Sequence, residues 1–366
     1  MVTAVKTIAG IFLLILAYFV LWPTAVRPIA WQPPTSDGYV GDFAPNEKLV
    51  GMSLIPLNGS VGPEDIVAQV QDDDVTIYAS SQDGAILRID PRTNEVSAFA
   101  DTGGHPLGVA FSPSDTLLVA DAYLGLVEVT SEGDVNVLTN RVAGEPIRFA
   151  DDVAVAPNGT VYFTDATTRF SAKAIGTHSA SALDVLEQSQ TGRVLAYDPQ
   201  SGETSIIADG LSFANGIALS PDGNALFVAE TGAYRVVKIN IAEAVAPEPI
   251  LVNLPGFPDN INVGPTLPDG TATYFLGLAG PRIAILDGLA NRPFLRKVIS
   301  RIPSWARPET GHYSFILQFT EDGKILDTWQ DPAGTFTLTT GAIAPGDGYL
   351  YVSSVDADSI GRVPFP

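Results

Sequence analysis

One unit of sequence recurs along this chain from residue 64 onward. Each copy contains a polar tetrad, a short apolar strand, a turn of the Pro-x-Gly type and an aromatic strand that usually ends in Asp or Glu. Further strands follow most copies, and short alternating strands joined by Gly-rich turns are typical of β-meanders. Six such units predict an all-β protein, a six-bladed β-propeller. The copies read PEDIVAQVQDDDVTIYAS from Pro63, HPLGVAFSPSDTLLVADA from His105, FADDVAVAPNGTVYFTDA from Phe149, FANGIALSPDGNALFVAE from Phe213, FPDNINVGPTLPDGTATYFLGLA from Phe257 and GAIAPGDGYLYVSS from Gly341.

The two ends of the repeat array complement each other. The last unit has too few strands before the chain ends at Pro366, and LVGMSLIPL (49–57) precedes the first unit without a unit of its own. We expect this segment to supply the outer strand of the last blade, because that closes the ring and removes an open sheet edge. A β-sandwich is the alternative, but a sandwich does not require six equal four-stranded units.

The N-terminal segment is not part of the repeat. Residues 7–22, TIAGIFLLILAYFVLW, are near the lower length limit for a helix that spans a bilayer. An uncleaved signal-anchor or a cleaved secretory signal both fit, although no convincing small-residue cleavage site follows. Either places the bulk of the chain on the extracytoplasmic side, periplasmic or extracellular, since Lys6 favours a cytoplasmic N-terminus. The predicted organisation is a membrane anchor at 1–22, a linker rich in Pro, Gly and Ser at 23–48, and the propeller at 49–366.

Charge and composition exclude several functions. The net charge of −21 repels phosphate backbones, so a general nucleic-acid binder is not expected. The chain has no cysteine, which excludes disulfides, thiolate metal sites and a cysteine nucleophile. With only three histidines, a multi-histidine metal site is improbable.

Two stretches interrupt the repeat. Residues 166–191 are polar and lie between two strands of the third unit, and residues 281–311 lie within the fifth. The second insert has apolar residues at helical spacing from Leu295 to Ile302, which predicts a short helix. Its basic residues leave two interpretations open: a helix on an anionic membrane surface, or a lid whose charges pair with the acidic body. These basic residues, within 282–307, are Arg282, Arg292, Arg296, Lys297, Arg301 and Arg307, against one acid, Asp287.

The polar tetrads predict a metal site. In a propeller the innermost strands line a central channel, so the residue that begins each of them points at the axis. Four units place carboxylates or carboxamides there, and Ca²⁺ prefers six to eight oxygen ligands of these kinds. Turn residues are the alternative interpretation, since Asx favours turns. The predicted calcium ligands are Glu64, Asp151, Asn215, Asp259 and Asn260.

Three more polar residues are candidates for a role at this site. Asp65 and Asp152, with a backbone carbonyl near Val109, could hold a second ion. His105 lies nearby and could serve the site, cap a turn or form part of the channel wall.

Several runs, including HPLGVAF, FADDVAV, GRVLAYDP, FANGIALSPDG and LPGFPDNI, resemble the strictosidine synthase-like family. The resemblance covers roughly residues 49–366. The superfamily includes paraoxonases and gluconolactonases, and this implies a six-bladed propeller with a catalytic Ca²⁺ that hydrolyses lactones and aryl esters. The metal ligands implied by the resemblance are the five residues named above.

This chain departs from the family pattern at three places. Asp151 stands where the family usually has Asn, which should tighten cation binding but reduce the ion's Lewis acidity. The paraoxonase histidine pair is absent, since its positions fall near Leu107 and Ala122. Strictosidine synthase itself uses a glutamate that opens the last unit, whereas TLTTGAIAPGDG has Gly341 or a neighbour there and no glutamate.

The resulting hypothesis is a calcium-dependent esterase or lactonase, with Asp259 as the base that activates water. The partner would be a small-molecule ester or lactone, with the membrane contacted through the N-terminal helix. A membrane-tethered, non-enzymatic binding propeller with structural calcium is the alternative, and a carbon–nitrogen-forming synthase is a third.

Overall fold

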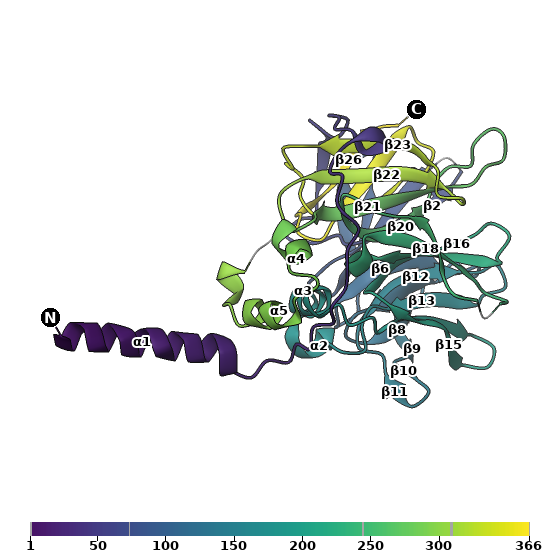
Figure 1. Ribbon diagram of the computed structural model, residues 1–366. Coiled ribbons are helices and arrows are strands. Elements are labelled where there is room, and N and C mark those ends of the chain that lie inside the picture. Colours follow the sequence, from purple (N-terminus) through teal and green to yellow (C-terminus); the bar gives the residue numbers. More distant parts are fainter. Residues whose placement is uncertain (1, 73, 244, 308–309, 366) are drawn as a thin grey trace.

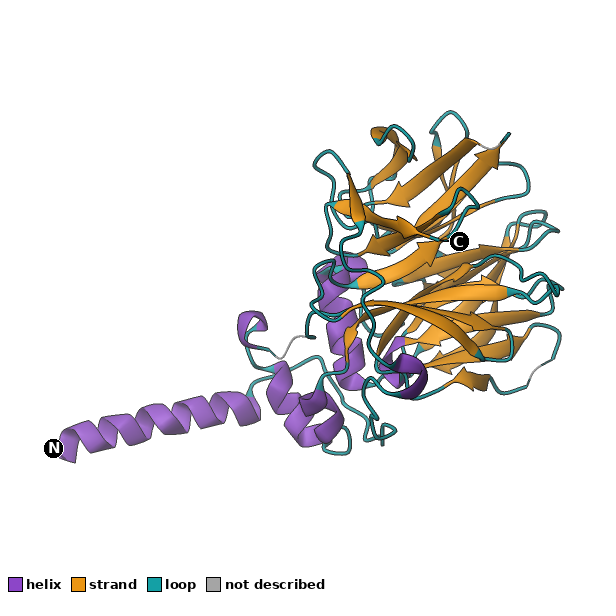
Figure 2. Cartoon of the chain, turned by 90° about the horizontal axis from the view of Figure 1, so that it is seen from above, coloured by secondary structure: helices purple, strands orange, loops and turns teal. Residues whose placement is uncertain are grey.

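The computed structural model describes residues 2–72, 74–243, 245–307 and 310–365. These residues form six four-stranded antiparallel sheets arranged as the blades of a propeller, with helices gathered on one side (Figures 1 and 2). The structure therefore confirms the all-β, six-bladed β-propeller.

The blades follow one another along the chain, each running from its innermost to its outermost strand. Blade 1 is β2 (Ile66–Gln71), β3 (Asp74–Ser80), β4 (Ala85–Asp90) and β5 (Glu95–Asp101); blade 2 is β6 (Pro106–Phe111), β7 (Leu117–Asp121), β8 (Gly125–Val129) and β9 (Val135–Thr139). Blade 3 is β12 (Ala150–Val155), β13 (Val161–Asp165), β14 (Gly192–Asp198) and β15 (Glu203–Leu211); blade 4 is β16 (Ala214–Leu219), β17 (Ala225–Glu230), β18 (Arg235–Asn240) and β19 (Glu248–Leu251). Blade 5 is β20 (Gly256–Val263), β21 (Thr273–Pro281), β22 (Ser314–Thr320) and β23 (Ile325–Asp331). A short hairpin, β10 (Arg141–Val142) with β11 (Glu145–Pro146), lies between blades 2 and 3.

Blade 6 joins the two ends of the propeller sequence. Its strands are β24 (Thr339–Ile343), β25 (Tyr349–Ser354), β26 (Ser359–Pro364) and β1 (Ser53–Pro56). β1 pairs antiparallel with β26, and Ile55 lies opposite Ile360. The predicted closure by the segment before the first unit is thus confirmed, and hydrogen bonds cover an edge that would otherwise be open.

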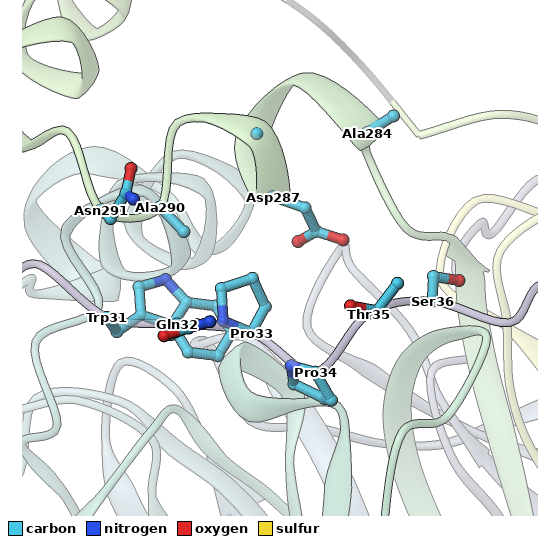
Figure 3. Close-up of a pocket in the computed structure, with 11 residues that line it drawn as sticks. Trp31, Gln32, Pro33, Pro34, Thr35, Ser36, Ala284, Asp287, Ala290 and Asn291 are labelled. Atoms are coloured by element: carbon cyan, nitrogen blue, oxygen red, sulfur yellow. The ribbon is translucent and has the colours of Figure 1, made fainter.

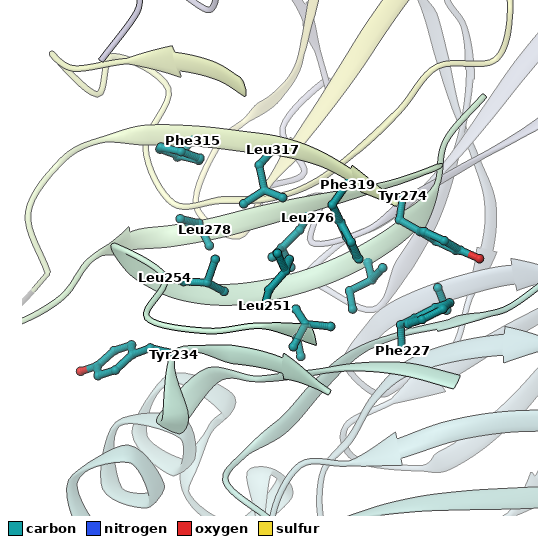
Figure 4. Close-up of a cluster of buried hydrophobic side chains, with 14 of the residues drawn as sticks. Phe227, Tyr234, Leu251, Leu254, Tyr274, Leu276, Leu278, Phe315, Leu317 and Phe319 are labelled. Atoms are coloured by element: carbon teal, nitrogen blue, oxygen red, sulfur yellow. The ribbon is translucent and has the colours of Figure 1, made fainter. Parts of the chain in front are cut away.

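Alternate residues of the inner strands pack against different neighbouring blades. In β21, Tyr274 and Leu276 face blade 4, where the ring of Tyr274 lies 4.8 Å from that of Phe227 (Figure 4). Phe275, between them, belongs to the cluster shared with blade 6. Because successive strand residues point to opposite faces, a strand buried on both faces must be apolar throughout. This explains the aromatic runs of the repeat.

The helices belong to the N-terminus and to the two inserts. α1 (Val2–Leu21) projects from the molecule, α2 (Ala172–Ile175) and α3 (Thr177–Glu187) form the first insert, and α4 (Ala284–Gly288) and α5 (Pro293–Ser300) form the second (Figure 1). Short 3₁₀ turns occur at η1 (Gly41–Phe43), η2 (Thr231–Ala233) and η3 (Ser304–Ala306). The helix predicted around Leu295 is therefore present as α5, and Ile302 lies just beyond its end. Helices α2 and α3 were not anticipated.

The predicted linker lies against the propeller instead of hanging free. Its residues 24–39, which we call the strap, run between the two inserts: the Ile29 amide donates to the carbonyl of Glu187 in α3, and the Trp31 amide donates to Ala290 (2.9 and 3.2 Å). Val26 is buried between α3 and α5, and the ring of Tyr39 stacks on Tyr313 at 4.1 Å. The strap is part of the packed structure.

Three arginines of the second insert donate hydrogen bonds to backbone carbonyls of the N-terminal segment. Arg282 donates to Pro34, buried Arg296 to Ile29 (2.8 Å), and Arg301 to Trp22 (2.6 Å). Arg282 also stacks on Tyr234 and lies 3.8 Å from Asp287. These bonds hold the second insert against the N-terminal segment, a contact that the two interpretations made from the sequence did not include.

Candidate metal centre

The predicted ligands sit at the same end of four innermost strands. In blades 3, 4 and 5 the pairing between the first two strands shifts register just after the strand begins, between Ala150 and Val153, Ala214 and Ile217, and Pro258 and Ile261. A residue in such a bulge is released from the ladder and its side chain is redirected. The bulges contain Asp151, Asn215, Asp259 and Asn260, and Glu64 lies just before β2 of blade 1.

The five side chains are buried and within reach of one another. The Nδ2 of Asn260 donates to Oε1 and to the carbonyl of Glu64, both at 2.9 Å, although the two residues are 196 positions apart. Thr340 of blade 6 donates to the same carbonyl. This threonine occupies the bulge of the last unit, a position that the repeat alignment could have indicated but that the sequence analysis missed.

The carboxylates raise one another's pKa values. Burial raises the pKa of Glu64 well above its ordinary value, and the negative charges of Asp259 and Asp151 add to the effect. The pKa of Asp151 is raised by burial and by Asp259. Burial also raises the pKa of Asp259 to about 7, partly offset by a hydrogen bond from Asn215. Negative charge is thus concentrated where desolvation already disfavours it.

Four oxygen atoms of this set have no hydrogen-bond partner among the described residues. They are Glu64 Oε2, Asp151 Oδ2, Asn215 Oδ1 and Asn260 Oδ1. Buried polar atoms are normally satisfied, so these oxygens need a partner that is not a side chain of this protein. A hard divalent cation fits such an oxygen-only set.

The fit of a divalent cation to this site depends on carboxamide oxygens as well as carboxylates. Within the described ranges, no three histidine or acidic side chains by themselves are arranged to hold a metal ion. The candidate set instead combines three carboxylates with Asn215 and Asn260, drawn from four blades. We therefore treat the calcium site as a proposal.

The carboxylates of Asp65 and Asp152 accept hydrogen bonds from neighbouring blades. These are the two residues that could hold a second ion. Asp65 accepts from the Val109 amide and from Asn262, both at 2.9 Å. Asp152 accepts from the amides of Val153 and Ile217, both at 2.7 Å. At Val109 it is the N–H, not the carbonyl, that faces Asp65. Both carboxylates line a pocket of about 370 Å³ at the opposite end of the channel.

His105 lies beside the first insert. Its ring is buried, contacts Tyr123 and comes within 3.4 Å of the hydroxyl of Thr177 at the start of α3. Burial lowers its pKa, so the neutral form is favoured. Leu107 and Ala122 nearby belong to an apolar cluster with Val26 and Ile299, and no histidine pair occupies those positions.

Gly341 of the last unit lies against the side chain of Asn262. A Cβ added at Gly341 would overlap the side-chain oxygen of Asn262, so a larger residue there would require Asn262 to move.

A second pocket, of about 430 Å³, lies between the strap and α4 (Figure 3). Trp31, Pro33, Pro34, Asp287 and Asn291 are among the residues that line it. It contains none of the predicted metal ligands and is separate from the candidate centre.

Comparisons with known proteins place the chain in a family. The profile described as strictosidine synthase matches residues 151–244, and the one described as strictosidine synthase-like, N-terminal, matches residues 41–89. Adipocyte plasma membrane-associated protein of Danio rerio is 30% identical over 96% of this chain and 87% of the relative, and the protein of that name from Homo sapiens is 28% identical over 91% and 82%. Strictosidine synthase-like protein 7 of Arabidopsis thaliana is 30% identical over 88% and 82%.

Solved structures share the fold at low identity. A gluconolactonase from Xanthomonas campestris has a TM-score of 0.60 and 15% identity, covering 93% of this chain and all of the other. A calcium-binding regucalcin from Agrobacterium tumefaciens has a TM-score of 0.54 and 12% identity, covering 83% and 93%. These structures show the shared fold alone. The relatives at 30% identity show that the chain belongs to the strictosidine synthase-like family, the family of the adipocyte plasma membrane-associated proteins.

Proposed function

We propose that the protein is a calcium-dependent hydrolase of esters or lactones whose site is the metal centre described above. The observation that carries the proposal is the convergence of four unpartnered, buried oxygen atoms from four blades. Glu64, Asp151, Asn215, Asp259 and Asn260 would hold Ca²⁺. The names of two solved propellers of this fold, a gluconolactonase and a calcium-binding regucalcin, support the assignment.

Bound calcium would polarise the substrate carbonyl and stabilise the negative charge that develops on its oxygen. The role of Asp259 is to take a proton from the attacking water and return it to the leaving oxygen. Asn215 would hold the Asp259 carboxylate in place through their hydrogen bond. The acyl part of the substrate would lie beneath the two inserts, against the apolar cluster that contains Leu107, Phe149 and Phe213.

The test is turnover of phenyl acetate and of a δ-lactone by the purified full chain, with and without a calcium chelator. We expect activity that the chelator abolishes, that returning calcium restores, and that Asp259→Ala lowers by at least about 100-fold. Asp269→Ala, in an exposed turn of the same blade, is the matched control and should leave the rate unchanged. Hydrolysis that survives both chelation and Asp259→Ala would reject the mechanism.

A binding propeller with structural calcium is the second candidate function. It is favoured by the buried apolar residues Leu107 and Ala122 at the positions where paraoxonases carry their histidines. Its expected result is a fall in melting temperature on chelation with no turnover of any ester or lactone.

We also propose that α1 remains attached as a membrane anchor with the propeller on the extracytoplasmic side. Residues 3–21 are long and apolar enough to cross a membrane, and no residue of their apolar window is buried in the structure. The relatives named adipocyte plasma membrane-associated protein, which align over nearly the whole chain, support the membrane anchor, and Lys6 before the apolar stretch supports the orientation.

A further inference from the structure

Large apolar side chains are exposed along one edge of the second insert. Trp305 in η3 is 84% exposed, Phe294 in α5 is 56%, Ile285 in α4 is 49% and Leu295 is 37%. We propose that this edge inserts among the lipids of the membrane surface, so that the face of the propeller carrying the inserts is turned toward the bilayer. The proposal rests on α1 being a retained membrane anchor and is independent of the hydrolase activity.

The end of α1 is bonded directly to the insert. The hydroxyl of Tyr18 donates to the carbonyl of Arg301 at 2.9 Å. In return, Arg301 donates to the carbonyls of Trp22 and Phe19 at 2.6 and 3.1 Å. These bonds place the last turn of the helix beside the C-terminal end of α5.

The strap continues this attachment along the same face. The Arg27 amide donates to Glu187 of α3 at 2.6 Å, and Arg169 donates to the carbonyl of Ala25 at 2.9 Å. Thr24 and Ser300, the last residue of α5, share a hydrogen bond at 2.9 Å. Unlike a flexible tether, this series of contacts restrains the propeller relative to α1.

The restrained geometry determines which side of the propeller meets the membrane. α1 leaves from the side that carries α2, α3, α4 and α5 (Figures 1 and 2), and the turn of η3, light green in Figure 1, projects from that same side. A spanning helix crosses the bilayer at about 20° from its normal. The side with the inserts must therefore face the lipid, at the level where the last turn of α1 emerges.

The amino-acid composition of this edge suits the surface region of the bilayer, where the last turn of α1 emerges. Trp and Phe are favoured at the boundary between headgroups and acyl chains. Arg27 and Arg292 are exposed on the same side and would lie among lipid phosphates. Three other arginines of the insert, Arg282, Arg296 and Arg301, keep their positive charges, but their N–H groups donate to backbone carbonyls of the protein and are not free to bind lipid phosphates. Contact with lipid should thus depend mainly on apolar insertion and should occur on neutral membranes too.

The consequence concerns the candidate metal centre. The bulges with Asp151, Asn215 and Asp259 lie at the beginning of the innermost strands, and both inserts join second to third strands at that same end of the blades. The end of the channel with these residues is therefore the end turned to the bilayer, and the pocket lined by Asp65 and Asp152 opens to water.

The absence of cysteine allows a site-specific test. Full-length Trp305→Cys and, separately, Phe294→Cys would be labelled with a nitroxide and reconstituted at low protein density in neutral phosphatidylcholine vesicles. Accessibility to oxygen, which partitions into lipid, and to a water-soluble nickel complex would be measured by electron paramagnetic resonance. Val263→Cys, 66% exposed at the end of β20 farthest from the inserts, is the control.

We expect the labels at 305 and 294 to be several-fold less accessible to the nickel complex than the label at 263, and more accessible to oxygen. Adding anionic lipid should change this little. Equal nickel accessibility at all three positions would overturn the proposal. Protection that appears only with anionic lipid, or dipolar broadening that disappears on dilution with unlabelled protein, would also overturn it, because the contact would then be electrostatic or with a second copy.

Discussion

At the scale of single residues, the carboxylates of the candidate metal centre repel one another. Glu64, Asp151 and Asp259 are buried together, and the pKa of each is raised by burial and by other carboxylates. Burying charges of one sign without a partner lowers stability. Asp151 adds charge where the family resemblance implies a neutral asparagine. A cation would relieve this repulsion, so the calcium-free protein should be measurably less stable than the calcium-bound one.

Glu64→Gln separates the repulsion from the ligand role. The glutamine keeps an oxygen that can accept from Asn260 but removes one negative charge. In chelator we expect the melting temperature to rise by roughly 2 to 4 °C, corresponding to about 1 kcal/mol. The further rise produced by calcium should shrink, because a ligand is lost. Differential scanning fluorimetry with and without calcium measures both quantities.

Glu248→Gln provides the control, because it makes the same chemical change on the exposed strand β19. It should leave both melting temperatures unchanged. If Glu64→Gln lowered the melting temperature in chelator and kept the full calcium increment, Glu64 would not be a ligand.

At the scale of elements, helix α3 contains a buried carboxyl group that makes the stability of the fold depend on pH. Asp184 is fully buried, accepts from Ser189 at 2.5 Å and has one oxygen without a partner among the described residues. Burial raises its pKa from 3.8 to about 6. The folded state therefore binds the proton more tightly than the unfolded state. Its contribution to stability is complete below pH 4 and is lost as the pH rises through about 6.

The substitution Asp184→Asn should remove this loss of stability at high pH. Asparagine stays neutral and can still accept from Ser189, so the variant and the native chain should have similar stability below pH 3.8, where Asp184 is mostly protonated in both the folded and the unfolded state. Above pH 7 we expect the variant to be more stable by up to about 3 kcal/mol, since two pKa units correspond to that free energy. Urea unfolding at several pH values measures the difference. Asp209→Asn, on the exposed part of β15, should show no such trend; a difference at position 184 that did not depend on pH would contradict the argument.

The sequence predicted the strands and the polar positions that begin the innermost strands, because both depend on local patterns. Alternation of apolar residues and Gly-rich turns indicated the units, and the polar tetrads coincided with bulges that hold Asp151, Asn215 and Asp259. The strap was not predicted, because its partners are backbone carbonyls that carry no residue signature. Arg296 was interpreted as a surface charge, yet it is buried and bonded to Ile29. Helix α3 was missed because THSASALDVLE has only weak apolar periodicity.

At the scale of the whole molecule, one short strand closes the ring. β1 joins the segment that follows the strap to the last strand of the chain, and Ile55 is fully buried between blade 6 and blade 1. Each blade packs on two neighbours only while the ring is closed. Loss of packing where the ring closes should therefore lower the stability of every blade, including those on the opposite side of the channel.

Ile55→Ala tests this cooperativity. Truncating a fully buried isoleucine lowers the free energy of unfolding by about 2 to 5 kcal/mol. Leu54→Ala, next to it on the half-exposed face of the same strand, should cost about 0.5 kcal/mol or less. If the ring unfolds as one unit, the most protected amides in β13 of blade 3 should lose hydrogen-exchange protection by the same free energy as those in β25 of blade 6. Protection lost in blade 6 alone would mean that the blades open independently and that closure stabilises only its own sheet.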